Sequence, residues 1–246
     1  MATNRFGLSR EIPSEVKRLV RQRCGFGCVI CGLGIVQYEH VCPEFKDAVS
    51  HQEENIALLC PQCHAKVTTG MWSKEKVALA MKNPQCKKTG YTSEFFDIAN
   101  NHPTLRFGGV LLRNCPTPIQ IQGYPLFSIK PSEEPSGPFL FSGLFTDSNG
   151  KFTLAIRENE WIAQSDCWDV EVRGQSITVR EDRRLIHLIL RVEPPNEIIV
   201  ERLNMSLCGY HFEANSDFLR IQSPTGRSNN FSSIICDNCA VGISLG

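Results

Sequence analysis

The 246-residue sequence predicts an α+β protein, with a small zinc-stabilised module at the N-terminus followed by a mainly antiparallel all-β domain. Two Cys-x2-Cys pairs, beginning at Cys28 and Cys60, lie close together in a short N-terminal stretch that also contains helical patterns. Beyond residue 104, short apolar segments alternate with Gly, Asn, Asp and Pro, which is typical of strands joined by turns. The chain also exceeds the common size of one domain. We therefore expect a module over 1–90, a connection over 91–104 and a β domain over 105–246.

The two cysteine pairs predict a structural zinc site. In each pair, a single turn can direct both sulfur atoms at one ion, and four thiolates complete a closed tetrahedral shell. A short module with little apolar sequence gains from such a site, because zinc binding is coupled to folding. The predicted ligands are Cys28, Cys31, Cys60 and Cys63.

The helices and strands around these pairs follow from local signals. Pro13 suits the first position of a helix in which Val16, Leu19 and Val20 share a face. Ser73 is a favourable N-cap for a later helix. The predicted order is a helix over 13–23, a strand over 34–43, a polar loop over 44–55, a short apolar strand or turn over 55–60, and helices over 61–70 and 73–83.

Four polar residues remain near the cysteine pairs once the zinc site is filled: Glu39, His40, Asn55 and His64. A lone histidine is usually a satisfied polar side chain, but the position of His40 between two metal-binding pairs favours a catalytic role. Successive side chains of a strand point to opposite faces, so Glu39 and His40 can share a cleft only if the strand end is distorted. His51, in the polar loop, could contact a metal or phosphate, although a solvated loop histidine is the favoured interpretation.

The order CVIC, YEHVCP and EENIALLCPQCH, with matching cysteine spacing, resembles the HNH endonuclease family over residues 10–90. The resemblance implies a ββα metal site and a distorted strand end before Pro43. It also implies that His40 is the general base and that Asn55 braces the loop that orients it. Glu39 and His64 would hold a catalytic Mg²⁺ or Mn²⁺. In this family the acid is more often Asp, whereas this chain has Glu39.

The C-terminal domain is predicted to be a β-sandwich or barrel, with a short β-helix less favoured. Alternating segments such as KFTLAI and SITVR support strands, and Gly174 and Gln175 suit a hairpin turn. No catalytic constellation is recognisable among its scattered histidines. The Cys236-x2-Cys239 pair is interpreted as two buried thiols, and the alternative is metal binding with a partner elsewhere in the chain.

The distribution of charge favours nucleic-acid binding by the first module. The net formal charge is zero, but residues 1–90 carry 13 Lys and Arg against 8 Asp and Glu, whereas residues 91–246 carry 13 against 18. A basic module joined to an acidic domain indicates that the first meets a polyanion such as DNA, although ordinary surface variation is the alternative. No apolar run is long enough for a membrane span or a signal peptide, so we expect a cytoplasmic protein without membrane partners.

The sequence thus predicts a metal-dependent endonuclease that hydrolyses DNA phosphodiester bonds. A rival interpretation is a zinc-stabilised nucleic-acid-binding protein without catalysis. The β domain could be a sensor or an assembly surface, forming a homo-oligomer or binding a regulatory protein, as in nuclease effectors of phage defence. It could instead recognise the target of a restriction-type endonuclease.

Overall fold

A computed structural model describes residues 3–246 and confirms the predicted α+β class, with few helices and mostly β-sheet. The chain forms two compact units. The first comprises the residues through Glu94 together with Gln164–Val172, and the second comprises Phe95–Ala163 and Arg173–Gly246. The sequence prediction counted residues 164–172 with the C-terminal domain. In the described part of the chain, no helix has the length and apolar character needed to span a membrane.

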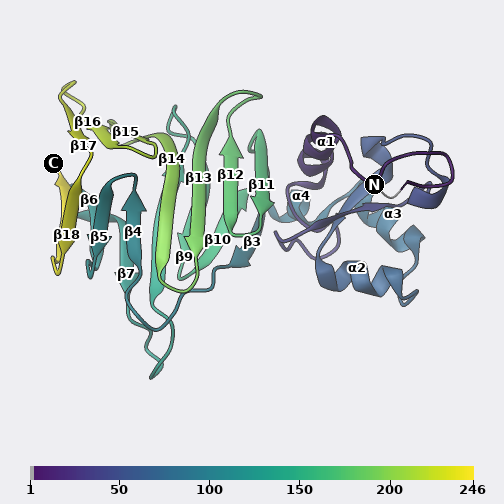
Figure 1. Ribbon diagram of the computed structural model, residues 1–246, viewed down its shortest axis with the longest axis horizontal. Coiled ribbons are helices and arrows are strands. Elements are labelled where there is room, and N and C mark those ends of the chain that lie inside the picture. Colours follow the sequence, from purple (N-terminus) through teal and green to yellow (C-terminus); the bar gives the residue numbers. More distant parts are fainter. Residues whose placement is uncertain (1–2) are drawn as a thin grey trace. The chain divides into compact units, whose positions relative to one another are not determined.

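The first unit contains a two-stranded sheet and four helices (Figure 1). Its β1 strand leads through two short 3₁₀ turns into β2, and α2 follows β2 after a single residue. This ββα order is the one expected from the sequence. The elements are α1 (Ser14–Cys24), β1 (Gln37–His40), β2 (Ile56–Leu59), α2 (Pro61–Thr68), α3 (Lys74–Lys82) and α4 (Gln85–Thr89).

Local chemistry sets the ends of these helices. Pro13 occupies the N-cap position of α1, without a side-chain capping hydrogen bond, instead of lying in its first turn. Gly25 ends the helix at φ 72°, a left-handed conformation that glycine adopts without strain. Ser73 caps α3 as predicted, because its Oγ accepts a hydrogen bond from the N–H of Lys76 at 3.3 Å. The short helix α4 was not predicted, since residues 84–90 carry no clear periodicity.

The β1–β2 hairpin places the candidate residues beside the core of this unit. The two strands pair in regular antiparallel register, with Glu39 opposite Ala57 and His40 opposite Ile56. All four residues of β2 are fully buried against α1 and α2. The paired part of β1, which ends at His40, contains no bulge.

A buried ion pair holds the distant segment 164–172 in the first unit. Arg21 of α1 donates to both carboxylate oxygens of Asp169, at 2.9 and 2.6 Å, and to the hydroxyl of Tyr38 at 3.0 Å. The side chains of Arg21 and Asp169 are only 8% and 1% exposed. Burial lowers the pKa of Arg21, but the hydrogen bond and charge of Asp169 more than offset this, and the net pKa is raised.

The second unit contains two extended sheets (Figure 1). Strands β3 (Tyr91–Phe95) and β11 (Asp169–Arg173) each cross a boundary between the units. One sheet of this unit has the order β19-β6-β7-β8-β9-β10, and the other runs from β12 through β17 with β4, β5 and β18 attached through β14. The strands of the first sheet are β6 (Thr117–Ile121), β7 (Tyr124–Lys130), β8 (Leu140–Thr146), β9 (Phe152–Arg157), β10 (Glu160–Gln164) and β19 (Val241–Leu245). Those of the second are β4 (Thr104–Phe107), β5 (Val110–Arg113), β12 (Ser176–Arg180), β13 (Ile186–Glu193), β14 (Glu197–Leu207), β15 (Tyr210–Ala214), β16 (Leu219–Gln222), β17 (Ser228–Phe231) and β18 (Ile234–Asp237).

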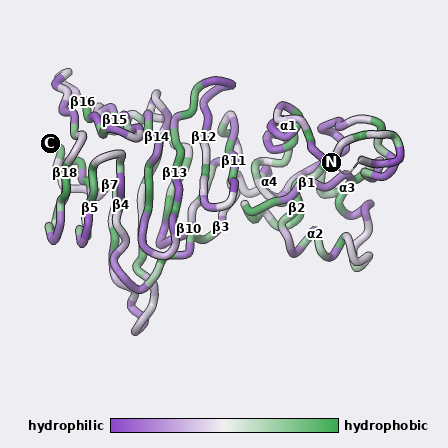
Figure 2. The backbone as a smooth tube through the Cα atoms, viewed as in Figure 1, coloured by the Kyte–Doolittle hydropathy of each residue, from purple (hydrophilic) through white to green (hydrophobic). Residues whose placement is uncertain are grey.

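The two sheets enclose an aromatic and aliphatic core. Phe107 of β4 lies 5.8 Å from Phe127 of β7, ring centre to ring centre, so side chains from the two sheets meet. Alternating hydrophobic positions run along β13 and β14 (Figure 2), as expected for strands with one buried face. Most pairs are antiparallel, but β4 pairs with β14, β5 with β18 and β6 with β19 in parallel.

Candidate functional site

The four predicted zinc ligands lie together at one end of the β1–β2 hairpin. All four sulfur atoms are within 4.8 Å of one another, and the Sγ of Cys31 is 3.5 Å from that of Cys60 and 3.8 Å from that of Cys63. With Zn–S bonds of about 2.3 Å, tetrahedral geometry places sulfur atoms about 3.8 Å apart. The group Cys28, Cys31, Cys60 and Cys63 therefore fits a metal ion such as zinc.

Backbone hydrogen bonds fix both cysteine turns. The N–H of Gly32 donates to the carbonyl of Cys28 at 2.9 Å, and the N–H of Val29 donates to Leu58 in β2 at 2.9 Å. Cys60 caps α2, and its Sγ accepts from the N–H of Cys63 at 3.4 Å. The first turn is thus attached to β2 and the second to α2, so metal binding at the cysteines also fixes the neighbouring elements.

The crowded thiols have strongly displaced pKa values. A hydrogen bond from Cys31 lowers the pKa of Cys28 to about 5, and burial raises the pKa of Cys63 to about 12, with the charge of Cys28 as a further cause. One thiolate is therefore readily formed, while further ones are opposed by like charge. A bound cation removes this opposition, because its charge stabilises all four thiolates.

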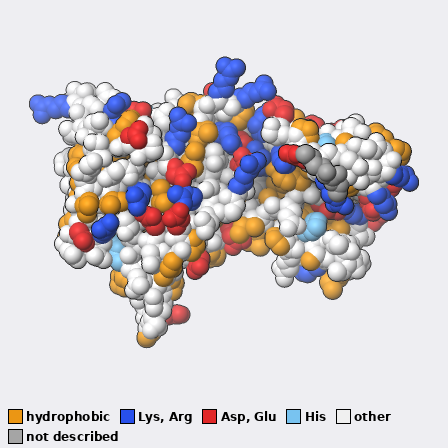
Figure 3. All heavy atoms as spheres, in the orientation of Figure 1, with side chains coloured by type: hydrophobic (Ala, Val, Ile, Leu, Met, Phe, Trp, Pro, Cys, Tyr) orange, Lys and Arg blue, Asp and Glu red, His pale blue; other side chains and the backbone are white. Residues whose placement is uncertain are grey.

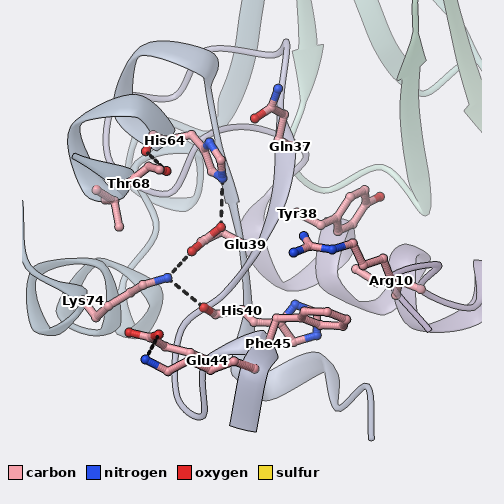
Figure 4. A pocket seen from close by; sticks show the side chains of 13 residues that line it. Arg10, Gln37, Tyr38, Glu39, His40, Glu44, Phe45, His64, Thr68 and Lys74 are labelled. Carbon is pink, nitrogen blue, oxygen red and sulfur yellow. Dashed lines mark hydrogen bonds and ion pairs between the residues drawn. The ribbon is translucent and has the colours of Figure 1, made fainter. Parts of the chain in front are cut away.

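A cleft of about 610 Å³ lies beside the zinc group and contains most of the candidate catalytic residues. Glu39 and His40 of β1 and His64 of α2 line it, together with Arg10 and Lys74 (Figure 4). Cys63 of the four-cysteine group and the cleft residue His64 are adjacent in the sequence. Because each residue of a helix is rotated by about 100° from the last, the sulfur and the imidazole can serve two different sites.

Glu39 is at the centre of the polar contacts in this cleft. Its Oε2 is 2.8 Å from Nε2 of His64, and its Oε1 forms an ion pair with Nζ of Lys74 (Figure 4). The Lys74 amine also donates to the backbone carbonyl of His40 at 2.9 Å. The structure therefore brings together the two residues predicted to hold the catalytic metal, and it adds a lysine that the sequence prediction assigned to a packing helix.

His40 is oriented by a second histidine. Its Nε2 lies 3.1 Å from Nδ1 of His51, and Nε2 of His51 lies 2.9 Å from the carbonyl oxygen of Ser9. That carbonyl can only accept, so Nε2 of His51 carries a proton. With both rings neutral, Nδ1 of His51 then accepts from His40, which leaves Nδ1 of His40 unprotonated and available as a base.

The environment of His40 favours the neutral ring. Burial lowers the pKa of His40, and the neighbouring His51 lowers it further, while Glu39 acts in the opposite direction. The side chain also packs edge-on against Phe45, with ring centres 5.4 Å apart. A neutral imidazole near pH 7 can accept a proton, which is the state that a general base requires.

Asn55 has no side-chain contact with His40 among the contacts that the structure describes. Its Nδ2 donates to Oε1 of Gln52 at 2.9 Å, while its backbone carbonyl accepts from the N–H of Val41 at 2.8 Å. The backbone of Asn55 thus holds the chain just after His40. The side-chain partner of His40 is His51, which the sequence analysis named only as an additional candidate.

Arg10 and Lys74, two of the three cationic residues that line the cleft, were absent from the sequence prediction, as was Lys46. Lys74 follows the N-cap of α3, and Arg10 precedes α1, with its guanidinium 4.7 Å from the ring centre of Phe45. Neither belongs to a recognisable motif, so only the tertiary structure places them beside Glu39 and His40.

Comparison of the chain with models of protein families, with curated proteins and with solved structures found no match.

Proposed function

We propose that this protein is a metal-dependent endonuclease of the HNH type that hydrolyses DNA phosphodiester bonds. The observation that carries the proposal is one cleft in which Glu39 contacts His64 while His40 is held neutral by burial and by His51. A carboxylate and an imidazole can bind a divalent cation, and a nearby neutral imidazole can act as a base.

The positions of Glu39 and His64 fit a shared divalent cation. Two adjacent ligands of an octahedral ion with bonds of about 2.1 Å are about 3.0 Å apart, and the carboxylate oxygen and imidazole nitrogen lie 2.8 Å apart. Mn²⁺ accepts both donor types, and Mg²⁺ prefers the carboxylate. The chemistry supplied by such a cation is stabilisation of the negative charge that develops on the leaving oxygen.

The residues of the chain would act around the scissile phosphate in distinct roles. Nδ1 of His40 takes a proton from the attacking water, which adds to phosphorus in line with the leaving 3′ oxygen. His51 holds the His40 ring through the bond to Nε2 and is itself held by Ser9. Lys74, whose amine contacts Glu39 in the same cleft, would neutralise a phosphate oxygen.

Positive charge around the cleft supports a polyanionic substrate. Arg10, Lys46 and Lys74 line the same cleft as the acidic Glu39 and Glu44. On the face shown in Figure 3, Lys and Arg side chains lie beside histidine on the unit that carries the helices. Such residues contact phosphates irrespective of base sequence, and the resulting affinity falls as salt concentration rises.

The test is cleavage of plasmid DNA by the purified full chain during a titration with Mn²⁺ or Mg²⁺, using two cleft variants. His40→Ala is expected to lower the rate about 10²- to 10⁴-fold at every metal concentration, because added metal cannot replace a base. His64→Ala is expected to be similarly slow at low metal but partly restored at high metal, since Glu39 remains as a ligand. His211→Ala, a change in β15 away from the cleft, is the matched control.

Zinc content and circular dichroism should stay at wild-type values in all three variants, because none of these histidines belongs to the four-cysteine group. Unchanged cleavage by folded His40→Ala would exclude His40 as the base. Metal-independent DNA binding without cleavage by the wild-type chain would favour the zinc-stabilised binding protein instead.

A further inference from the structure

The outer edge of the second sheet is formed by two consecutive strands, β17 and β18. In the strand pairing of residues 3–246, β17 pairs only with β16, and β18 pairs only with β5. Only Ser232 and Ser233 separate the two strands, so residues 228–237 follow one another along the end of this sheet (Figure 1). One side of each strand therefore presents backbone N–H and C=O groups to which no other strand is paired.

The hairpin of β16 and β17 shows which backbone groups face outward. The N–H of Ser223 donates to the carbonyl of Arg227 at 2.7 Å. In an antiparallel pair only every second residue is bonded to the neighbouring strand. Ser228 and Asn230 are one and three positions after Arg227, so their N–H and C=O groups point away from β16. These groups can pair with a further strand while every hydrogen bond between β16 and β17 is kept.

This edge lies beyond the covered part of the sheet. Residues directly opposite each other in an antiparallel pair share a face, yet Ile221 of β16 is buried whereas Asn229, its partner in β17, is exposed. In β18, Ile234 and Ile235 are 37% and 62% exposed. Eight of the ten residues from 228 to 237 are exposed, so the two strands gain little from the core and leave apolar side chains in water.

Charged residues are found only at the two ends of this edge. Natural edge strands are commonly protected from other chains by charged side chains or proline, but residues 228–236 contain neither. Arg227 precedes β17 and Asp237 ends β18, and both are exposed. The carboxylate of Asp237 accepts a hydrogen bond from Asn114 at 3.0 Å, which fixes it at the end of β18. A second copy aligned antiparallel would bring each arginine to the aspartate of the other chain.

We propose that residues 228–237 pair edge to edge and antiparallel with the same residues of a second copy, so that the protein is a homodimer. A two-fold axis requires a surface that is complementary to itself. An antiparallel strand edge with an uncharged centre and opposite charges at its ends meets this requirement. Pairing would satisfy the outward backbone groups and bring side chains of the second copy against Ile234 and Ile235. This inference does not depend on the proposed endonuclease activity.

The first test is the mass of the full chain in solution, measured by sedimentation equilibrium over a range of protein concentrations under reducing conditions. The wild type should have twice the 27.6 kDa of one chain. Asn230→Pro removes an outward N–H while sparing the bonds to β16, and it should weaken dimerisation by at least about 10-fold. Asn230→Ala removes the same side chain but keeps the N–H, so it is the matched control and should remain dimeric.

A charge exchange at the ends of the edge gives a second test. Arg227→Glu and Asp237→Arg should each weaken self-association by about 10-fold at low salt, because every dimer would then contain two contacts between like charges. Mixed in equal amounts, the two variants should form a dimer with one chain of each, since both end contacts again join opposite charges. This recovery requires that both variants are folded, so it separates pairing from damage to the monomer.

The control for the charge change is Arg202→Glu, which makes the same change at an exposed position of β14 and should dimerise like the wild type. A monomeric wild type would overturn the proposal. So would a dimer that is unaffected by Asn230→Pro, because the copies would then meet at another surface. A mixture of the two charge variants that is no more dimeric than its components would equally contradict it.

Discussion

Replacement of Lys74 by methionine should tighten the binding of divalent metal while slowing DNA cleavage. The Lys74 amine forms an ion pair with the carboxylate of Glu39 and donates to the carbonyl of His40 at 2.9 Å. A cation that binds Glu39 must displace this amine and also overcome its positive charge. Methionine keeps the length and apolar stem of lysine but removes both obstacles.

The size of the effect follows from the exposure of the ion pair. The side chains of Lys74 and Glu39 are 27% and 19% exposed, so the pair lies between a surface ion pair and a buried one. Hydrogen bonds to charged groups contribute about 1.5–3 kcal/mol, and partial solvent screening reduces this to about 1–2 kcal/mol. Removing the competitor should therefore strengthen metal binding by about 5- to 30-fold.

Calorimetric titration of Mn²⁺ into zinc-loaded protein measures this change, and plasmid cleavage at saturating Mn²⁺ measures the role of Lys74 in the reaction. The matched control is Lys76→Met, which removes the same charge from the same helix. Lys76 lies over the ring of Trp72, 3.7 Å from its centre, and does not line the cleft. If both variants bind Mn²⁺ more tightly by the same factor, the change in affinity comes from net charge alone. If Lys74→Met does not bind Mn²⁺ more tightly, the assignment of Glu39 as a metal ligand is refuted.

Two other contacts lead to predictions with different measurements. In His51→Ala, the rate of cleavage should fall by about 5- to 10-fold through loss of the His40 hydrogen bond. The acid limb of the pH–rate profile should also move to higher pH, because His51 lowers the pKa of His40; an unchanged profile would contradict the pairing. Asp169→Ala should cost about 3–5 kcal/mol in the free energy of unfolding by leaving Arg21 buried without its main partner, whereas Arg21→Met combined with Asp169→Leu should cost much less. Urea denaturation measures the free energy of unfolding of the single and the double variant. An equal loss of stability in the two would show that the unpaired buried charge of Arg21 does not cause the destabilisation.

The sequence predicted those features that depend on local spacing. Two Cys-x2-Cys pairs need only a turn each, so the zinc group could be predicted before any tertiary contact was known. The N-cap at Ser73 likewise follows from neighbouring residues. The α+β class followed from the change in pattern beyond the first module.

Features created by long-range contacts could not be predicted in this way. Asp169 lies 148 residues from Arg21, and no local pattern indicates that its segment joins the first unit. Cys115 and Cys239 lie more than a hundred positions apart, and only the parallel pairing of β5 with β18 and of β6 with β19 brings the turns that carry them side by side. Lys74 has the sequence context of an ordinary exposed helix residue.

The arrangement of α2 connects the four-cysteine group to the proposed catalytic cleft. Cys60 caps this helix and Cys63 is in its first turn, so a zinc ion bound there fixes the start of the helix to the turn that carries Cys28. His64 is the next residue, so an ion bound at this turn would also set the position of His64 relative to Glu39. Since β2 joins directly to Cys60 and pairs with β1, the carboxylate and the imidazole are held from both sides. A metal ion bound at this one short helix terminus would therefore also fix the geometry of the cleft.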